Sequence, residues 1–386
     1  MSSVLLKNIG TIVSGDISAP ILDGDAILVE DGKIQKVGNE AALNVAQADL
    51  TIDCAGTTVT PGLFDSHCHV VLGDYTPRQK QIGFLESEVH GGVTTFISAG
   101  EVHLAGRPKD PAGTKALAIL AAKSFANFRP GGGKVVGGAV ILEKGLTQAD
   151  FEEMAREGVR TVGEVGLGSV KNPEDAASMV RWAQDCGMTV MMHTGGTSIP
   201  GSSTVTAEMV IRTAPDIVSH INGGPTAVAL DEVKRLVTET DFALEMVHCG
   251  NPKIMVEAAD LCVAHNALAR IIIGNDAPSG TGVIPLGVLR VIAHLASLSA
   301  IKPEQALCMA TGNTARIHKL PRGIIAPGLE ADLVIMDAPM GSVGKDTLTA
   351  IAAGDVPAVS LVLVDGEIVV AKSRNTPPPV RRPEVR

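Results

Sequence analysis

Aromatic residues are scarce in this sequence: Phe, Tyr and Trp together make up 2% of its 386 residues. The formal net charge is −10, and no block rich in Lys and Arg interrupts it. Nucleic-acid-binding surfaces rely on basic patches and on aromatic side chains that stack on bases. We therefore expect no nucleic-acid partner. The hydrophobic core must be built mainly from Val, Ile, Leu, Ala and Met.

Long apolar runs and export signals are also missing. The longest apolar stretch, residues 283–300, is interrupted by Pro285, Arg290 and His294, so it predicts a buried or interface helix and no membrane span. Residues 1–7 lack the basic segment and long apolar run of a signal peptide. The six cysteines form no Cys-x-x-Cys pair, which fits reduced thiols in a cytoplasmic protein.

The first 56 residues carry short β patterns and no helix pattern. Strands are predicted at 3–9, 26–30, 33–37 and 50–54, with a hairpin turn at 30–33. This segment is therefore expected to be all β.

From residue 63 onwards, β-branched runs alternate with amphipathic stretches of helix length, such as 174–186, 227–238 and 253–266. The predicted strands are 63–70, 93–99, 134–142, 160–166, 188–193, 216–220, 242–248 and 270–275. Eight strands, each followed by a helix, predict an α/β fold with a (β/α)₈ TIM-like barrel. The connection at 100–113 is long and rich in Gly and Pro, and could cover an active site.

The β patterns return near the end of the chain, at 331–337, 359–364 and 367–370, with a second hairpin turn at Asp365-Gly366. We expect the two end segments to form one small β-sandwich. The predicted domains are residues 1–62 and 323–374 for the sandwich, 63–322 for the barrel, and 375–386 for a Pro/Arg tail. The tail is expected to be mobile or to form an arm on a neighbouring subunit.

His67 and His69 lie two residues apart in the first predicted barrel strand. Side chains alternate between the two faces of a strand, so both imidazoles are expected on the same face. Two such imidazoles provide half of a metal site for Zn, Fe, Ni or Cu. Taken alone the pair is a weak signal, because ten histidines in a chain of this length produce such pairs by chance.

Polar residues also follow the later predicted strands at a regular spacing. They are Glu164, His193, His220, His248 and Asp276, at intervals of 29, 27, 28 and 28 residues. One βα unit of a barrel takes about 30 residues, so these positions are expected at equivalent heights on successive strands. Their side chains would then converge on the mouth of the barrel. Any single histidine there could instead be a hydrogen-bonded core residue.

The chain resembles the amidohydrolase superfamily over nearly its whole length. The resemblance is carried by residues 60–69 (TPGLFDSHCH), the strand ends at His193 and His220, Asp276, and residues 328–334 (GLEADLV). It implies a dinuclear metal site at the mouth of a barrel that is flanked by a β-sandwich.

The same resemblance assigns the ligands. His67, His69 and Asp276 resemble those of the more buried metal, and His193 and His220 those of the second. Many dinuclear relatives bridge the metals with a carboxylated lysine, where this chain has Glu164; Lys144 and Lys171 are out of register. The resemblance therefore implies two divalent ions per subunit, Zn and/or Fe, with Glu164 as the bridge.

The resemblance also implies a reaction, the opening of a C–N bond in a cyclic amide by a metal-bridging hydroxide. Whole-chain similarity within the superfamily favours a cyclic enamide of nicotinate breakdown, with 1,4,5,6-tetrahydro-6-oxonicotinate and water giving 2-formylglutarate and ammonia. Asp276 is expected to accept and return the proton. His248 could polarise the carbonyl or contact the substrate, and a structural role is as plausible.

Two segments are candidates for binding a substrate carboxylate. Thr194, Gly195, Gly196 and Thr197 follow His193 and could offer backbone N–H groups, as could Ser198. Arg107 and Lys109 in the long connection are rivals. A solvated loop without a ligand is an equally plausible interpretation of both segments.

Other functions stay open at this point. Within enzymes, the alternative is a cyclic amide hydrolase similar to dihydroorotase or hydantoinase; a deaminase fits less well, since it would usually need only one metal. Outside enzymes, the alternative is a metal-free barrel that binds a small molecule. We also expect a homo-oligomer, with a tetramer as the first guess, because the apolar stretch 283–300 and the tail suggest surfaces that contact a neighbour.

Overall fold

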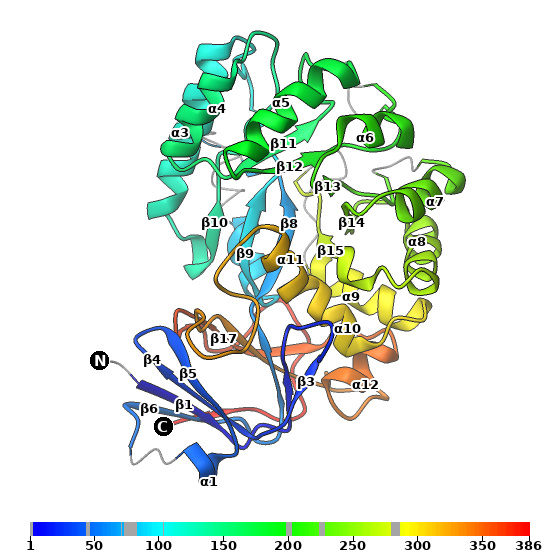
Figure 1. Ribbon diagram of the computed structural model, residues 1–386. Coiled ribbons are helices and arrows are strands. Elements are labelled where there is room, and N and C mark those ends of the chain that lie inside the picture. Colours follow the sequence, from blue (N-terminus) through cyan, green and yellow to red (C-terminus); the bar gives the residue numbers. More distant parts are fainter. Residues whose placement is uncertain are drawn as a thin grey trace.

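A computed structural model describes residues 3–43, 47–70, 72, 83–102, 104–197, 203–223, 228–278 and 286–386 (Figure 1). Helices and parallel strands fill the upper part of the view in Figure 1, and the sheets that contain both chain ends lie below them. The predicted mixed α/β class is therefore confirmed.

Eight parallel strands form two sheets. One has the order β10-β9-β8 and the other the order β11-β12-β13-β14-β15. Their bounds are β8 Leu63–Cys68, β9 Val93–Ser98, β10 Lys134–Val136, β11 Thr161–Val165, β12 Thr189–Met192, β13 Ile217–Val218, β14 Ala243–Val247 and β15 Ile271–Gly274. Isolated parallel bridges join Val140 to Val162 and Cys68 to Ala277. Through these bridges the strand order β8 to β15 returns to β8.

Helices connect these strands, and several begin at a side chain that caps them. Asp110 accepts a hydrogen bond from Gly113 N, and Asn172 and Asn251 cap the helices that follow them in the same way, each with Pro at the first helical position. The helices are α3 Pro111–Asn127, α4 Gln148–Arg156, α5 Pro173–Asp185, α6 Ala207–Thr213, α7 Leu230–Glu239, α8 Pro252–Ala264, α9 Gly287–Leu298, α10 Pro303–Cys308 and α11 Thr314–Ile317, with a further helical segment at 83–89. The predicted helices 174–186 and 253–266 are thus confirmed. The third, 227–238, is confirmed as α7, although residue 227 lies outside the described part.

The two end segments of the chain share two sheets. One has the order β18-β17-β16-β7-β2-β3 and the other the order β19-β6-β1-β4-β5. Their strands are β1 Ser3–Lys7, β2 Thr11–Val13, β3 Ile21–Leu22, β4 Ala26–Glu30, β5 Lys33–Gly38, β6 Leu50–Asp53, β7 Thr58–Pro61, β16 Leu333–Asp337, β17 Ala358–Val364, β18 Glu367–Val370 and β19 Glu384–Val385. Both predicted hairpins, β4-β5 and β17-β18, are confirmed.

One apolar cluster joins these two sheets. It includes Leu6 and Ile27 from the beginning of the chain, and Leu333 and Leu363 from its end, all fully buried. The prediction that the first 56 residues contain no helix is wrong, because Glu40–Leu43 form α1, a single turn that buries Leu43. A second short helix here is α12, Thr347–Ala352.

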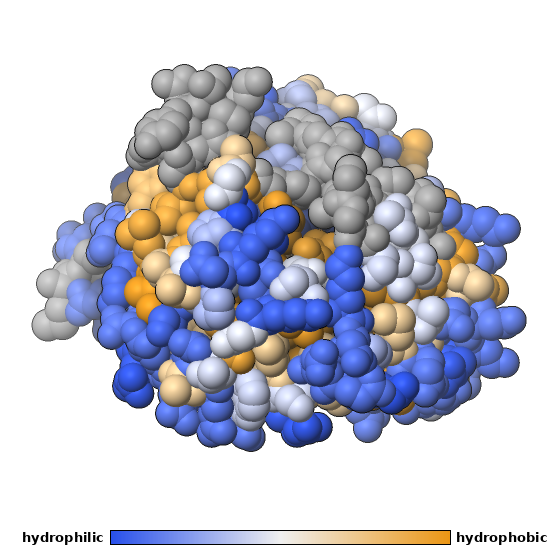
Figure 2. Space-filling view, turned by 90° about the horizontal axis from the view of Figure 1, so that it is seen from above, coloured by the Kyte–Doolittle hydropathy of each residue, from blue (hydrophilic) through white to orange (hydrophobic). Residues whose placement is uncertain are grey.

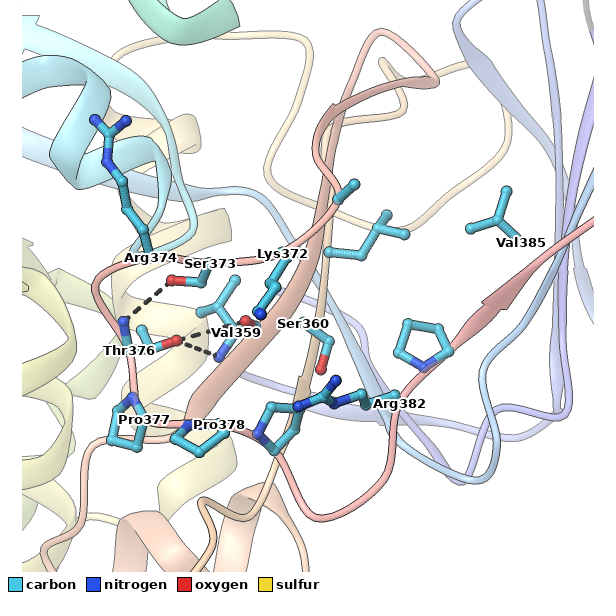
Figure 3. A pocket seen from close by; sticks show the side chains of 14 residues that line it. Val359, Ser360, Lys372, Ser373, Arg374, Thr376, Pro377, Pro378, Arg382 and Val385 are labelled. Atoms are coloured by element: carbon cyan, nitrogen blue, oxygen red, sulfur yellow. Dashed lines mark hydrogen bonds between the residues drawn. The ribbon is translucent and has the colours of Figure 1, made fainter.

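The tail packs against its own chain, so the expectation of a mobile tail is wrong, while the alternative of an arm on a neighbouring subunit stays a prediction. Met340 N donates to Pro378 O, and β19 pairs with β6. Arg381 binds Asp337, which is fully buried, and this ion pair fixes the tail against β16. The tail loop also closes a cavity of about 580 Å³ beside β17, which Ser360 and Arg382 help to line (Figure 3).

Helix α9 covers most of the apolar stretch that was predicted at 283–300; residues 283–285 lie outside the described part. Most of its apolar residues, including Val288, Ile292 and Leu295, are buried within the chain, whereas Leu298 at its end is exposed. These buried residues contact the same core as β14 and β15, so they provide no argument for an oligomer. The stretch was predicted to form either a buried helix or an interface helix, and the buried helix is confirmed.

None of the described helices is both long and apolar enough to cross a membrane. Seen from above, the rim of the molecule is mostly hydrophilic, and hydrophobic residues gather nearer the middle (Figure 2).

Candidate metal centre

Six predicted ligands lie at the carboxyl ends of five parallel strands. His67 and His69 belong to β8 and the residue that follows it, Glu164 lies in β11, and the other three follow β12, β13 and β15: His193, His220 and Asp276. All six are buried. Carboxyl ends of neighbouring parallel strands meet at one edge, which explains why residues about 28 positions apart come together.

The strand β15 leaves room for His67 because it ends in glycine. A Cβ at Gly274 would lie 2.8 Å from His67 Cβ and 2.9 Å from Ser66 Oγ. Those distances are shorter than real Cβ contacts, so any larger residue at position 274 would displace the imidazole. Gly274 therefore contributes to the site through its lack of a side chain.

The two carboxylate oxygens of Glu164 face different histidines. Oε1 lies 2.7 Å from His220 Nε2 and 3.4 Å from His193 Nδ1. Oε2 lies 3.5 Å from His69 Nε2 and 3.6 Å from His67 Nε2. A carboxylate placed between two pairs of imidazoles has the arrangement needed to share its oxygens between two cations.

His193 Nδ1 and His220 Nε2 lie 3.1 Å apart. Two nitrogens that bind one tetrahedral ion at about 2.0–2.1 Å are separated by about 3.3 Å, so this spacing suits a common metal ion. Together with Glu164 these histidines form one of the ligand groups whose atoms lie within 4.8 Å of one another.

The second half of the cluster contains His67, His69 and Asp276. Asp276 Oδ1 lies 3.1 Å from His69 Nε2 and 3.6 Å from His67 Nε2. Groups with ligand spacing are His67 with His69 and Glu164, and His67 with His220 and Asp276.

Unpartnered nitrogens support a metal at this site. His67 Nε2 is buried and makes no hydrogen bond to any described residue, although it points between Glu164 and Asp276. Buried polar atoms rarely lack a partner, and a ligand ion would satisfy this one. Neutral imidazoles and carboxylates without thiolate suit Zn, Fe or Mn. The residues present therefore fit divalent metal ions.

Electrostatics in the cluster favour ionised carboxylates. Burial opposes the ionisation of Glu164, but the charge on His67 and hydrogen bonds from His193 and His220 hold the pKa of its carboxyl well below the usual range. Burial likewise opposes the ionisation of Asp276, yet the hydrogen bond with His69 and the nearby histidines lower its pKa. Both side chains are thus ready to act as anionic ligands.

A second group of acids has ligand spacing but holds a lysine. Glu330, Asp332 and Asp365 surround Lys134 Nζ at 2.6–3.0 Å. The buried ammonium group already supplies a cation, so this group joins β10 to the end segments and offers no separate metal site.

His248 is the one residue of the regular series that does not reach the cluster. Its ring stacks on His294 of α9, with centroids 6.3 Å apart and an interplanar angle of 26°. Burial, together with the charges on His294 and Arg290, lowers the pKa of His248 to about 4. The side chain is therefore placed between β14 and α9 as a neutral imidazole.

The residues predicted to bind a substrate carboxylate are distributed around the same edge. Thr194 Oγ1 donates to Ser219 O, and Gly195 forms a backbone bridge with Val205. Gly196 is half-buried and Thr197 is exposed. Ser198 lies outside the described residues.

The two basic candidates differ in their surroundings. Arg107 Nη1 lies 2.8 Å from Glu143 Oε1, and both side chains are largely or fully buried. Lys109 is exposed. Arg107 is therefore neutralised within the chain, whereas Lys109 faces solvent.

Sequence reasoning missed Glu245. This residue is fully buried in β14, where its Oε2 lies 2.6 Å from His67 Nδ1. The available signal was one carboxylate inside the apolar run Ala243–Val247. A buried charge needs a partner, so that position alone could have indicated a site.

Comparisons with known proteins identify the family. The amidohydrolase family model matches residues 58–369, which is most of the chain. The chain belongs to the amidohydrolase family. The predicted superfamily is thus confirmed, as is the prediction of a hydrolase that acts on C–N bonds.

Two relatives show how the similarity varies. An enamidase from Eubacterium barkeri is 62% identical over 385 residues, which cover 100% of both chains. Adenine deaminase 3 from Rhizobium meliloti (strain 1021) is 27% identical over 82% of this chain, and the match spans 52% of that deaminase.

Solved structures agree with this family. The crystal structure of an enamidase, described as a new member of the amidohydrolase superfamily, has a TM-score of 0.96 and 61% identity, with 100% of both chains covered. A β-aspartyl dipeptidase from Fervidobacterium islandicum AW-1 has a TM-score of 0.66 at 17% identity, and it shares the fold alone.

Proposed function

We propose that this protein is an enamidase that opens the ring of 1,4,5,6-tetrahydro-6-oxonicotinate. The observation that carries the proposal is the 62% identity to an enamidase over the full length of both chains. The adenine deaminases are far less similar and match over only about half of their own length. Water would cleave the cyclic amide, and the enamine so released would hydrolyse to 2-formylglutarate and ammonia.

We propose that the six-residue cluster holds two divalent ions, with Zn and/or Fe as the metals. His67, His69 and Asp276 would hold one ion, His193 and His220 the other, and Glu164 would contact both. Two such ions supply an activated water molecule and polarise the amide carbonyl. Glu164 suits the bridging role because its two oxygens already face different histidine pairs.

Asp276 is our candidate for the proton transfers. Its side chain is 11% exposed, whereas that of His67 is fully buried, so Asp276 is the ligand that a substrate could reach. One carboxylate oxygen faces His69. The other oxygen would accept a proton from water and return it to the leaving nitrogen.

The substrate carboxylate needs a donor near this edge. We propose that it binds the segment Thr194–Thr197, with Lys109 as the basic residue. The N–H groups of Gly196 and Thr197 make no backbone hydrogen bond to another described residue, whereas that of Gly195 donates to Val205 O. Arg107 is a weaker candidate because Glu143 already neutralises it.

The larger architecture that we propose is a (β/α)₈ barrel over residues 63–322, inserted between the halves of a β-sandwich at 1–62 and 323–374, with a tail at 375–386. The bridges that return the strand order to β8 support the barrel. The apolar cluster shared by the two end sheets supports the sandwich.

We also propose a cytoplasmic homo-oligomer, with a tetramer as the first expectation. Exposed apolar residues on the end segments, such as Met340, Val343 and Val380, support a contact between subunits. Light scattering that gave a monomer at micromolar concentration would contradict this assembly.

The experiment that tests the proposed function is a comparison of substrates. Purified protein with its metals should release ammonia from 1,4,5,6-tetrahydro-6-oxonicotinate faster than it opens dihydroorotate or hydantoin, and should leave adenine unchanged. Preference for dihydroorotate or hydantoin would favour the alternative cyclic amide hydrolase. Absence of both metal and activity would favour a metal-free binding protein.

A further inference from the structure

Glu245 lies beneath the metal cluster and connects to it through one histidine. The residue is fully buried, and its carboxylate uses both oxygens: Ser66 Oγ donates to Oε1 at 2.6 Å, and Oε2 lies 2.6 Å from His67 Nδ1. These contacts join β14 to β8 across 179 and 178 positions of sequence.

The contact between Glu245 and His67 determines which ring nitrogen of His67 can bind a metal ion. A carboxylate oxygen accepts this hydrogen bond, so in the neutral ring, the form that binds a metal ion, the hydrogen of His67 lies on Nδ1. The lone pair is then on Nε2, the nitrogen that faces Glu164 and Asp276 at 3.6 Å each. A hydrogen bond from the far nitrogen of a ligand histidine fixes its ring and increases its basicity.

The other histidines of the cluster are held less firmly. His69 Nδ1 faces the carbonyl oxygen of Gly100 at 3.3 Å, which is a neutral and longer contact. The far nitrogens of the second pair, His193 Nε2 and His220 Nδ1, make no hydrogen bond to any described residue. Among the described residues, a carboxylate therefore contacts the far nitrogen of a ligand histidine in only one half of the cluster, the half that contains His67, His69 and Asp276.

A purely structural role would not require this residue. Ala243 and Val247, two positions before and after Glu245 in β14, are buried apolar residues. Burial of a carboxylate in such surroundings is unfavourable unless the group is paired and hydrogen-bonded. The chain tolerates that cost at a position whose carboxylate contacts His67.

We propose that Glu245 is a positioning residue that directs His67 Nε2 towards the ion held by His67, His69 and Asp276, and makes this ion the more tightly bound of the two. The inference rests on the proposed function only in that it takes the cluster to bind two metal ions. It requires nothing of the substrate.

The test is a zinc titration of metal-free protein, followed by calorimetry and by metal analysis of the dialysed samples. Wild type should bind two ions in two steps. In Glu245→Gln the tighter step should weaken by about 10- to 100-fold, and the weaker step should change by less than about threefold. Glu88→Gln is the matched control: it alters another fully buried glutamate, which among the described residues accepts hydrogen bonds from Asn275 and Leu286 and from no cluster ligand, and both steps should stay as in wild type.

Ser66→Ala provides an independent second variant. It removes the hydrogen bond to Oε1 but leaves the carboxylate on His67, so the tighter step should weaken by only a few-fold. Thermal unfolding of each variant checks that it is folded. Unchanged binding in Glu245→Gln, or equal weakening of both steps, would overturn the inference. Wild-type protein that binds two zinc ions but fails to open the enamide would contradict the proposed function alone.

Discussion

Glu164 Oε1 lies 2.7 Å from His220 Nε2, while the other oxygen of the same carboxylate is turned towards His69 and His67. One glutamate thus occupies the position between the two halves of the cluster. This arrangement does not depend on a modified lysine, since Glu164 itself supplies both oxygens.

Glu164→Gln should therefore lose metal. An amide has only one oxygen and no charge, so it cannot replace a carboxylate that two ions share. We expect metal per subunit to fall well below two, with hydrolysis lost, even in excess bicarbonate. Elemental analysis after dialysis measures this. Lys144→Ala is the control and should keep both ions, because Lys144 is exposed; the opposite pattern in the two variants would mean that a lysine is the bridge.

Asp276→Asn should separate metal binding from proton transfer. The amide could still ligate weakly but could not accept a proton, and loss of a general base typically lowers the rate by 10²- to 10⁴-fold. We expect kcat for the enamide to fall by at least about a hundredfold with both ions retained. A variant that kept its metals and a normal kcat would contradict this.

Gly274→Ala should disturb His67 without changing any polar group. Its Cβ would meet His67 Cβ at 2.8 Å and the backbone nitrogen of His67 at 2.9 Å. We expect the free energy of unfolding to fall by about 1–3 kcal/mol and zinc binding to weaken. Gly83→Ala is the control, because a Cβ there meets no atom of the described residues within 4 Å. Chemical denaturation of both variants provides the comparison.

We expect His318 to lower the free energy of unfolding in acid. Burial lowers the pKa of its imidazole to about 4, a shift that the charge on Glu245 opposes, and its ring nitrogens have no hydrogen-bond partner among the described residues. In the unfolded chain the pKa of this imidazole is about 6.5. The contribution of the neutral His318 to the free energy of unfolding is therefore fully present above pH 6.5, and it is lost as the pH decreases towards 4. The full contribution is about 3 kcal/mol, since one pKa unit is worth about 1.4 kcal/mol.

His318→Leu should remove this part of the acid-side loss. The measurement is the free energy of unfolding of both proteins between pH 8 and pH 4. We expect the two curves to differ in slope below pH 6.5 and to run parallel above it. Parallel curves over the whole range would show that His318 does not titrate in this way.

Sequence periodicity identified most of the cluster because each βα unit has nearly the same length. His193, His220 and Asp276 follow their strands at matching positions, and Glu164 lies in register with them. His248 has the same spacing but the opposite orientation. In β14 the side chain of Glu245 faces His67, so alternation turns Val247 the same way and His248 outwards, where it meets His294.

Glu245 and the tail could not be deduced from spacing. A lone carboxylate in a strand does not reveal which histidine, 178 positions away, will contact it. The tail is rich in Pro and Arg, a composition typical of mobile segments, yet Arg381 finds the buried carboxylate of Asp337. Both depend on contacts between distant parts of the chain, which local patterns do not contain.

The most direct test of the account is the hydrolysis of 1,4,5,6-tetrahydro-6-oxonicotinate by protein whose metal content is known. Metal-free protein should be inactive, and stepwise addition of Zn or Fe should restore ammonia release, with full activity at two ions per subunit. Ammonia and 2-formylglutarate should form in equal amounts. Full activity in metal-free protein, or no activity with both ions bound, would contradict the account.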